Sequence, residues 1–193
     1  HILHSAAHGY QRIVLRCSPF YNNRPLYPIT RHWHKLLKIQ RSDTFDLKRR
    51  KLQRFLHRRN LQDHSISVLL AATLFTDHAE KLPQFSDSPA ELRKLKLDTL
   101  LTVIKMFSAQ TPLLIAVEDA HWIDSSTAEL LSMLSAKIGA WPVALIITTR
   151  TAPTWLAEDL QRLKRTLLQP LSEDASDELI RLIAAGRQIP IAA

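Results

Sequence analysis

Glycine is scarce in this chain, with 3 residues among 193, and no stretch reads Gly-x-x-x-x-Gly-Lys-Ser/Thr. A phosphate-binding loop of that kind needs glycines, because its backbone must approach the phosphates closely. Cys17 is the single cysteine, which excludes an internal disulfide framework and is typical of a reducing compartment. No apolar run approaches the roughly 20 residues of a membrane span, and no signal peptide is recognisable. We therefore expect a cytoplasmic protein without a membrane partner.

The composition predicts a globular α/β domain with a sizeable core, since 46% of the residues are hydrophobic and 23% are charged. The formal net charge of +8 is concentrated between Lys48 and Arg59. Such an excess is compatible with nucleic acid, acidic lipid or an acidic partner domain. The chain begins at His1 rather than Met and stops at Ala193 without a terminal cap, so we expect a piece of a longer protein, truncated at both ends.

Strand-like and helix-like patterns alternate along the chain. This order predicts a layered α/β fold with a parallel sheet flanked by helices. The expected strands are residues 12–16, 113–117, 143–150 and 165–169. The expected helices begin near Pro28, 45, 66, Ser88, Asp124 and Ser172.

Several helix ends carry recognisable capping residues. Ser88 and Glu91 predict a reciprocal capping box around Pro89. Asp124 predicts the cap of the next helix, and Gly139 predicts its end. A last helix is expected to follow Ser172 and to end near residue 186.

Two carboxylates follow the buried strand at 113–117, namely Glu118 and Asp119. Ligands of open α/β sheets sit just beyond the carboxyl ends of the strands. Adjacent acids there are costly unless something cationic compensates them. We interpret Glu118 as a magnesium ligand, direct or through water, and Asp119 as the group beside an attacking water. The alternative is an ordinary polar strand end.

Polar residues also end the next strand. Arg150 would share a rim with Glu118 and could contact the terminal phosphate of a nucleotide, with Thr149 adding a hydroxyl. A plain surface arginine fits the sequence equally well. His121 could serve the phosphate site or simply orient its loop.

The basic run from Lys48 to Arg59 surrounds an apolar stripe and predicts an amphipathic helix with a solvated charged face. Nucleic-acid binding is the competing interpretation. Neither aromatic stacking positions nor zinc-ligand spacing support it, so nucleic acid is not the expected partner.

Residues 113–124, which include Glu-Asp-Ala-His-Trp-Ile-Asp, resemble the Walker B segment of AAA-type ATPase modules in bacterial signalling proteins of the STAND class. Residues 16–28, beginning Arg-Cys-Ser-Pro-Phe-Tyr, resemble the branch associated with adenylate/guanylate cyclases. Residues 143–150 are similar to the sensor-like strand, and residues 168–171 to the segment before the lid helices. The resemblance extends from about residue 12 onward.

The resemblance implies a P-loop NTPase (AAA/ASCE-type) fold that lacks its first strand and phosphate loop. Residues 12–111 would hold the second strand and a helical insert, and residues 112–186 the Walker B and sensor-like strands. The lost strand would leave a gap between the strands at 143 and 165. The implied function is an ATP- and Mg-dependent switch, able to self-associate, that controls a covalently attached cyclase, kinase or transcription-factor domain.

The chain departs from many relatives of this kind, which place Asp first and Glu second at the strand end. Here Glu118 precedes the shorter Asp119. The parent is therefore expected to be a slow ATPase switch rather than a motor, and this chain alone to be inactive. An origin-recognition-like ATPase that binds nucleic acid, and a degenerate scaffold without nucleotide, are the alternatives.

Overall fold

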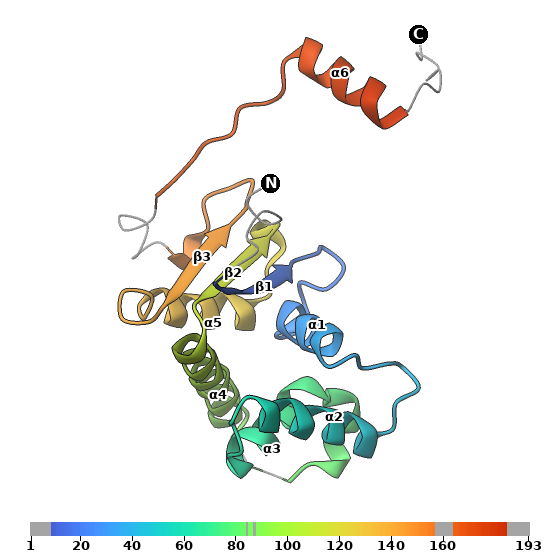
Figure 1. The fold of residues 1–193 in the computed structure, drawn as a ribbon, viewed down its shortest axis with the longest axis vertical. Coiled ribbons are helices and arrows are strands. Elements are labelled where there is room, and N and C mark those ends of the chain that lie inside the picture. The colour runs from blue at the N-terminus through green and yellow to red at the C-terminus, as the bar shows by residue number, and fades with distance from the viewer. Residues whose placement is uncertain (1–8, 84, 87, 157–163, 185–193) are drawn as a thin grey trace. The chain divides into compact units, whose positions relative to one another are not determined.

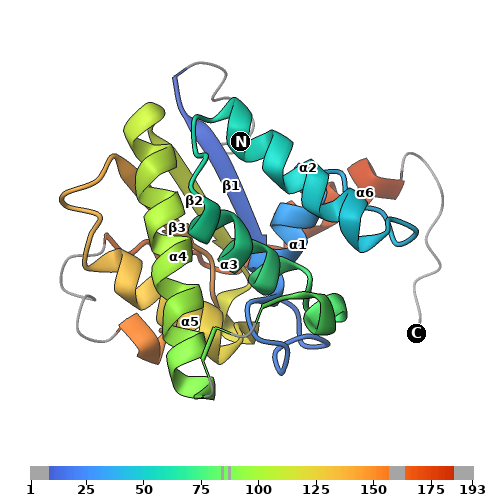
Figure 2. The same ribbon diagram turned by 90° about the horizontal axis from the view of Figure 1, so that it is seen from below.

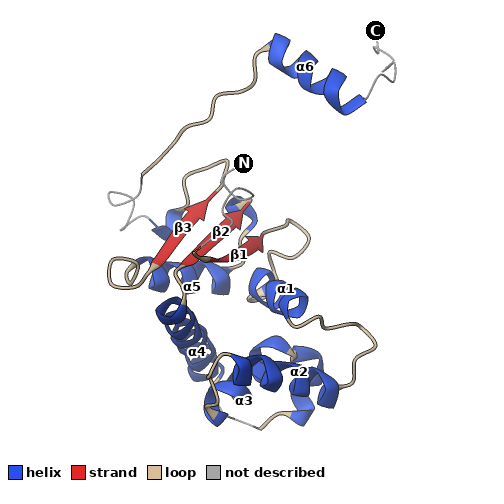
Figure 3. Cartoon of the chain, viewed as in Figure 1, coloured by secondary structure: helices blue, strands red, loops and turns tan. Residues whose placement is uncertain are grey.

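The computed structural model describes residues 9–83, 85–86, 88–156 and 164–184. The chain divides into two compact units, His1–Leu160 and Gln161–Ala193. Among the described residues, the first unit holds all the strands and five α-helices, and the second holds one α-helix (Figure 3).

A small parallel sheet organises the first unit (Figure 1). Its strands are β1 (Gln11–Arg16), β2 (Leu113–Glu118) and β3 (Val143–Ile147), in the order β1-β2-β3. The register places Arg16 beside Glu118, and Val117 beside Ile147. The carboxyl ends of the three strands therefore meet along one rim. The expected α/β class, with a parallel sheet flanked by helices, is confirmed.

Five α-helices and three short 3-10 helices complete the described part of the first unit. The α-helices are α1 (Tyr27–Leu36), α2 (Phe45–Arg58), α3 (His64–Leu74), α4 (Pro89–Gln110) and α5 (Ser125–Ser135). The 3-10 helices are η1 (Thr76–Lys81), η2 (Ala120–Trp122) and η3 (Thr154–Leu156).

Helices α1, α4 and α5 cover one face of the sheet, and α2 and α3 lie beyond α1 and α4 (Figures 1 and 2). Leu15 and Ile115 point from the sheet into this layer. Trp33 of α1 meets Phe107 of α4 there, with ring centroids 6.0 Å apart. Leu130 of α5 is fully buried in the same cluster. Burial of these large side chains orders the unit, because each fully buried one contributes about 1.5–3 kcal/mol.

The predicted caps are partly confirmed. The Asp124 carboxylate accepts the N–H of Thr127 at 2.9 Å, as expected for the start of α5. Ser88 Oγ accepts the N–H of Glu91 at 3.4 Å. The reciprocal half of the capping box is wrong: the Glu91 carboxylate accepts from the hydroxyl of Ser86 at 2.5 Å instead. The Ser88 N–H donates to the Ser86 hydroxyl oxygen at 3.0 Å, so Ser86 lies between the two groups of the expected box.

Two predicted boundaries are wrong. The strand expected at 143–150 ends at Ile147. The Thr148 N–H still donates to the Val117 carbonyl, but the Thr148 carbonyl accepts from Ala120, which lies beyond the end of β2. The neighbouring strand has ended there, so the pairing stops. Helix α5 ends at Ser135, not at Gly139, because the chain closes into successive turns there.

The strand expected at 165–169 is also wrong. Residues 164–170 have no regular structure in the described part of the second unit. Leu167 and Leu168 are 83% and 84% exposed. An extended segment without a paired neighbour does not form a stable strand, so the apolar pattern alone was insufficient.

The second unit contains α6 (Glu173–Ala184). Ser172 caps it as predicted, since its hydroxyl accepts the N–H of Ala175 at 3.2 Å. The predicted helix end near residue 186 lies outside the described residues. None of the helices in the described parts of the chain is long and apolar enough to cross a membrane.

Candidate functional site

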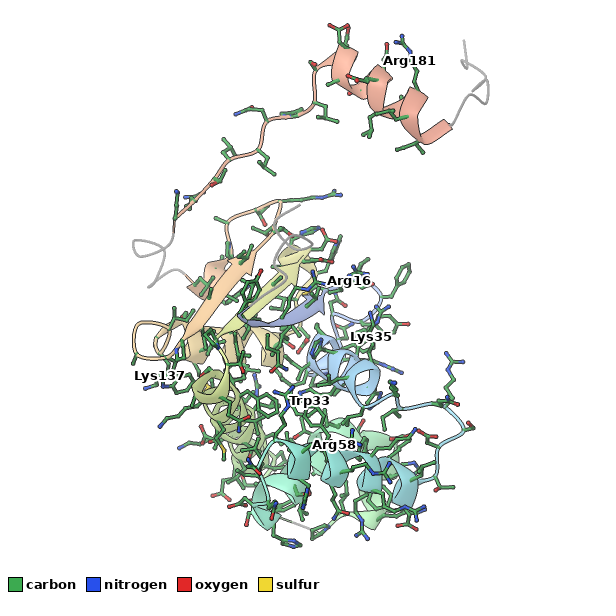
Figure 4. All side chains as sticks on the ribbon, in the orientation of Figure 1. Arg16, Trp33, Lys35, Arg58, Lys137 and Arg181 are labelled. Carbon is green, nitrogen blue, oxygen red and sulfur yellow. The ribbon has the colours of Figure 1, made fainter. Side chains whose placement is uncertain are left out.

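Glu118 lies on the rim at the carboxyl end of the middle strand, where Arg16 accompanies it. Arg16 Nε donates to Glu118 Oε2 at 2.7 Å, with the arginine side chain 67% exposed and the glutamate 28% exposed. Figure 4 shows Arg16 at the end of β1. Arg16 thus supplies a cation that compensates Glu118. The sequence analysis missed this pair, because it follows from the register of β1 against β2.

Asp119 turns the chain off the sheet. Its φ of 56° lies in the left-handed region, which Asp adopts more readily than most residues. Its N–H donates to Thr148 Oγ1 at 3.2 Å, and the next N–H, of Ala120, donates to the Thr148 carbonyl at 2.9 Å. Asp119 is exposed, and no hydrogen bond to its carboxylate is found among the described residues. Thr148 therefore holds the turn, and the carboxylate remains open to solvent.

Arg150 and Thr149 follow β3 and are both exposed. The Thr149 hydroxyl donates to the Thr151 carbonyl at 2.8 Å. Within the described residues, no ion pair or hydrogen bond joins Arg150 to Glu118 or to Asp119. The two acids thus share the rim with Arg16 and Thr148, whereas Arg150 and Thr149 are not bound to them.

His121 is an unusual feature beside the rim. Both of its ring nitrogens are buried, and neither has a hydrogen-bond partner in the part of the chain that the structure describes. The ring lies 5.1 Å from that of Trp122, which is 40% exposed. An unpaired buried polar atom costs about 1–3 kcal/mol, so the packing around this turn has to offset that cost.

Cys17 follows β1 and is buried. Burial, and then the charges of Asp124 and Asp119, raise the pKa of its thiol to about 12. The thiol is therefore protonated near neutral pH and is no nucleophile.

Glu118 and Asp119 can hold magnesium only together with further oxygen ligands. No group of three or more His, Cys, Asp or Glu side chains is arranged to hold a metal ion among the described residues. Proteins commonly bind Mg²⁺ through one or two carboxylates together with phosphate oxygens. Glu118 and Asp119 fit that arrangement as oxygen donors, although Arg16 already engages one oxygen of Glu118.

The sequence predicted a solvated charged face for α2, but not all of its basic side chains are exposed. Lys48 is 5% exposed, and its ammonium contacts Asp77 at 2.5 Å. Lys51 pairs with Asp43 at 2.6 Å. Four exposed cations remain on the helix: Arg49, Arg50, Arg54 and Arg58.

Comparison with known proteins adds little to this geometry. No known protein family matches the chain, and no solved structure matches it. A stretch of 93 residues, 47% of the chain, is 33% identical to a protein of Rhizobium meliloti (strain 1021) that is described as uncharacterized. The match covers 9% of that protein's length, so the activity of the whole protein is a matter for proposal.

Proposed function

We propose that this chain is part of a P-loop NTPase module of the AAA/STAND type, an ATP- and Mg-dependent switch in a cytoplasmic signalling protein. Bound nucleotide would control an attached output domain, such as an adenylate/guanylate cyclase. One observation carries the proposal: Glu118 and Asp119 follow each other at the carboxyl end of the middle strand of a parallel sheet. Ligands of open α/β sheets bind at this place.

The two edge strands of the sheet differ in composition, and this difference supports the proposal. β1 has exposed arginines at Arg12 and Arg16, and such charges are typical of a natural edge strand. β3 is apolar throughout, with Ile146 37% exposed, and no strand of the described residues pairs with its outer side. A strand of this composition is typical of a sheet interior. The resemblance puts the strand of the phosphate loop at that position.

Each rim residue has a distinct role in the proposal. Glu118 contributes a carboxylate oxygen to Mg²⁺, and Arg16 holds that carboxylate in place on the rim. Asp119 accepts a hydrogen bond from a water beside the phosphates. Arg150, which is exposed, contacts the terminal phosphate, and the exposed Thr149 adds its hydroxyl. When bound, Mg²⁺ neutralises charge on the phosphate oxygens.

The test uses the longest polypeptide that the gene encodes. We expect Glu118→Gln to weaken Mg-dependent ATP binding by about tenfold or more, which corresponds to about 1.4 kcal/mol. Asp119→Asn should slow hydrolysis and leave ATP affinity nearly unchanged. Glu80→Gln is the control, since its side chain is 66% exposed on η1. If the wild-type polypeptide binds no nucleotide in calorimetry, the degenerate scaffold is the correct alternative.

Nucleic-acid binding is a second candidate, and α2 favours it. Arg50, Arg54 and Arg58 recur every four residues and are exposed, without an ion pair among the described residues. They span about 12 Å along the helix, at the usual rise of 1.5 Å per residue. A row of guanidinium groups suits a phosphate backbone.

Salt dependence tests this candidate. If α2 binds DNA, affinity falls steeply as salt rises, and changing the three arginines to Gln lowers the slope of log affinity against log salt by about 2–3. A control with three exposed lysines changed to Gln removes the same charge elsewhere: Lys94, Lys105 and Lys137. Equal losses in both variants would indicate non-specific attraction to a basic protein and would exclude α2 as the site.

A further inference from the structure

A groove of about 990 Å³ opens within the first unit, between α1, α3, the first half of α4 and the start of α5. Its walls include none of the rim residues Glu118, Asp119, Thr149 and Arg150. Small-molecule sites usually have volumes of about 300–1,000 Å³, so the groove is large enough for an organic ligand.

Positive charge dominates the groove. Four cations line it against one acid, Asp77, which is already paired with Lys48. The cations are Arg24, Arg31, Arg93 and Lys96. Arg93 forms an ion pair with Glu129 of α5. The other three form no ion pair among the described residues, so the groove has a surplus of about three positive charges with nothing bound.

Lys96 shows most clearly that an anion would be favourable here. It is half-buried on α4, and burial lowers the pKa of its ammonium group. The free energy cost of removing a charge from water is normally offset by an opposite charge. No acidic side chain of the described residues is paired with Lys96, and the Arg24 guanidinium lies 5.8 Å from the centroid of the Tyr21 ring.

The groove is held open by contacts between its walls. The Leu26 N–H, before α1, donates to the Asp124 carboxylate at 2.8 Å and fixes that wall to the start of α5. His34 Nε2 of α1 lies 2.7 Å from the Leu74 carbonyl of α3. Asp124 does not line the groove, and its other oxygen accepts from the Thr127 hydroxyl at 2.6 Å. Its charge is thus engaged by donors at the cap. Such a preformed site lowers the entropic cost of binding.

The floor of the groove is apolar. Leu26, Leu74 and Leu97 are buried at its base, and Leu92 is partly buried beside them. An inorganic anion would leave this surface unused, whereas the carbon skeleton of an organic ligand would cover it.

We propose that this groove binds a small organic phosphate, with the phosphoryl oxygens on Arg24, Arg31 and Lys96 and the organic part on the leucine floor. A phosphoryl group concentrates nearly two negative charges and three acceptor oxygens in one place. One such group can therefore accept from several of the cations that line the groove, which the separated carboxylates of an acidic peptide do less well. The site is distinct from the rim and does not depend on the proposed nucleotide switch.

Calorimetric titration of the 193-residue chain with pyrophosphate and with fructose 1,6-bisphosphate tests the proposal. We expect dissociation constants below about 1 mM at an ionic strength of about 0.1 M, with the sugar phosphate binding more tightly. The double variant Arg31→Gln/Lys96→Gln should bind both probes at least about tenfold more weakly. The control Lys105→Gln/Lys137→Gln removes the same charge from exposed positions outside the groove and should change affinity less than about twofold.

Three results would overturn the proposal. The first is no binding of either probe at concentrations up to about 10 mM. The second is an equal loss in the two double variants, which would indicate general attraction to a basic protein. The third comes from co-sedimentation with phosphatidylcholine vesicles containing about 5% phosphoinositide. If the vesicles bind through Arg31 and Lys96 while the soluble probes do not, the groove recognises a lipid headgroup instead. Thermal melting of both variants confirms that they fold, since the changed side chains are exposed or half-exposed.

Discussion

At the level of single residues, Asp124 connects two segments that are far apart in sequence. Its carboxylate accepts the N–H groups of Leu26 at 2.8 Å and Thr127 at 2.9 Å, and the Thr127 hydroxyl at 2.6 Å. Leu26 itself has a φ of 58°, a left-handed conformation that a leucine adopts only when its surroundings impose it. Asp124 is 3% exposed, so water cannot replace it. The start of α1 and the start of α5 therefore depend on this one side chain.

We expect Asp124→Ala to lower the free energy of unfolding by about 3 kcal/mol, through the lost cap and an unsatisfied buried N–H. Asp63→Ala is the matched control: Asp63 caps α3 by accepting the Ile66 N–H at 2.9 Å at an exposed site. Its loss should cost about 1 kcal/mol. Urea denaturation measures both values, and equal losses would show that the contact with Leu26 contributes nothing.

Cys17 makes the stability of the fold depend on pH in the alkaline range. Its thiol pKa is raised from 9.0 to about 12 in the folded chain, chiefly by burial. Between these values the unfolded chain has lost the thiol proton and the folded chain has kept it, so stability falls as pH rises. We expect Cys17→Ala to reduce the loss of stability measured between pH 9 and 11 relative to wild type. Parallel pH profiles for the two proteins would contradict this.

Among the strands of the described residues, β3 has the edge that is most open to pairing with another chain. Its outer edge is unpaired within the described residues, and its sequence is Val-Ala-Leu-Ile-Ile. An apolar edge strand is a template for pairing with another chain. β1 is better protected, because Arg12 and Arg16 are exposed on it.

We expect sedimentation velocity to show concentration-dependent self-association, and Ile146→Lys to suppress it by placing a charge on this edge. Ile146 is 37% exposed, so the lysine ammonium can reach water. Phe20→Lys is the control, because Phe20 is 87% exposed in a loop outside the sheet. If Phe20→Lys suppresses association equally, the edge of β3 is not the cause.

For the molecule as a whole, nucleotide binding needs parts that a rim of acids cannot replace. Backbone amides and a lysine of a phosphate loop hold most of a triphosphate, and this sequence contains no such motif. We therefore expect the 193-residue chain to lack a site that binds ATP with micromolar affinity and loses that affinity in Glu118→Gln. Titration calorimetry with ATP and Mg²⁺ checks this. A micromolar site lost in that variant would show that the rim binds nucleotide without the loop.

The sequence by itself determined the features that depend on near neighbours. Apolar runs and helical periodicity predicted three of the strands and the main helices, and Asp124, Ser88 and Ser172 predicted helix starts, because these signals act within a few residues. The wrong strand at 165–169 shows the limit of such signals, since a strand requires a partner.

Only the tertiary structure decided which distant groups meet. The ion pair of Arg16 with Glu118 follows from strand register over 102 residues, and the burial of Lys48 follows from the position of Asp77. The basic groove is assembled from four helices that the sequence places far apart. Long-range packing sets these contacts, and no local pattern encodes it, because burial and pairing depend on how the elements fit together.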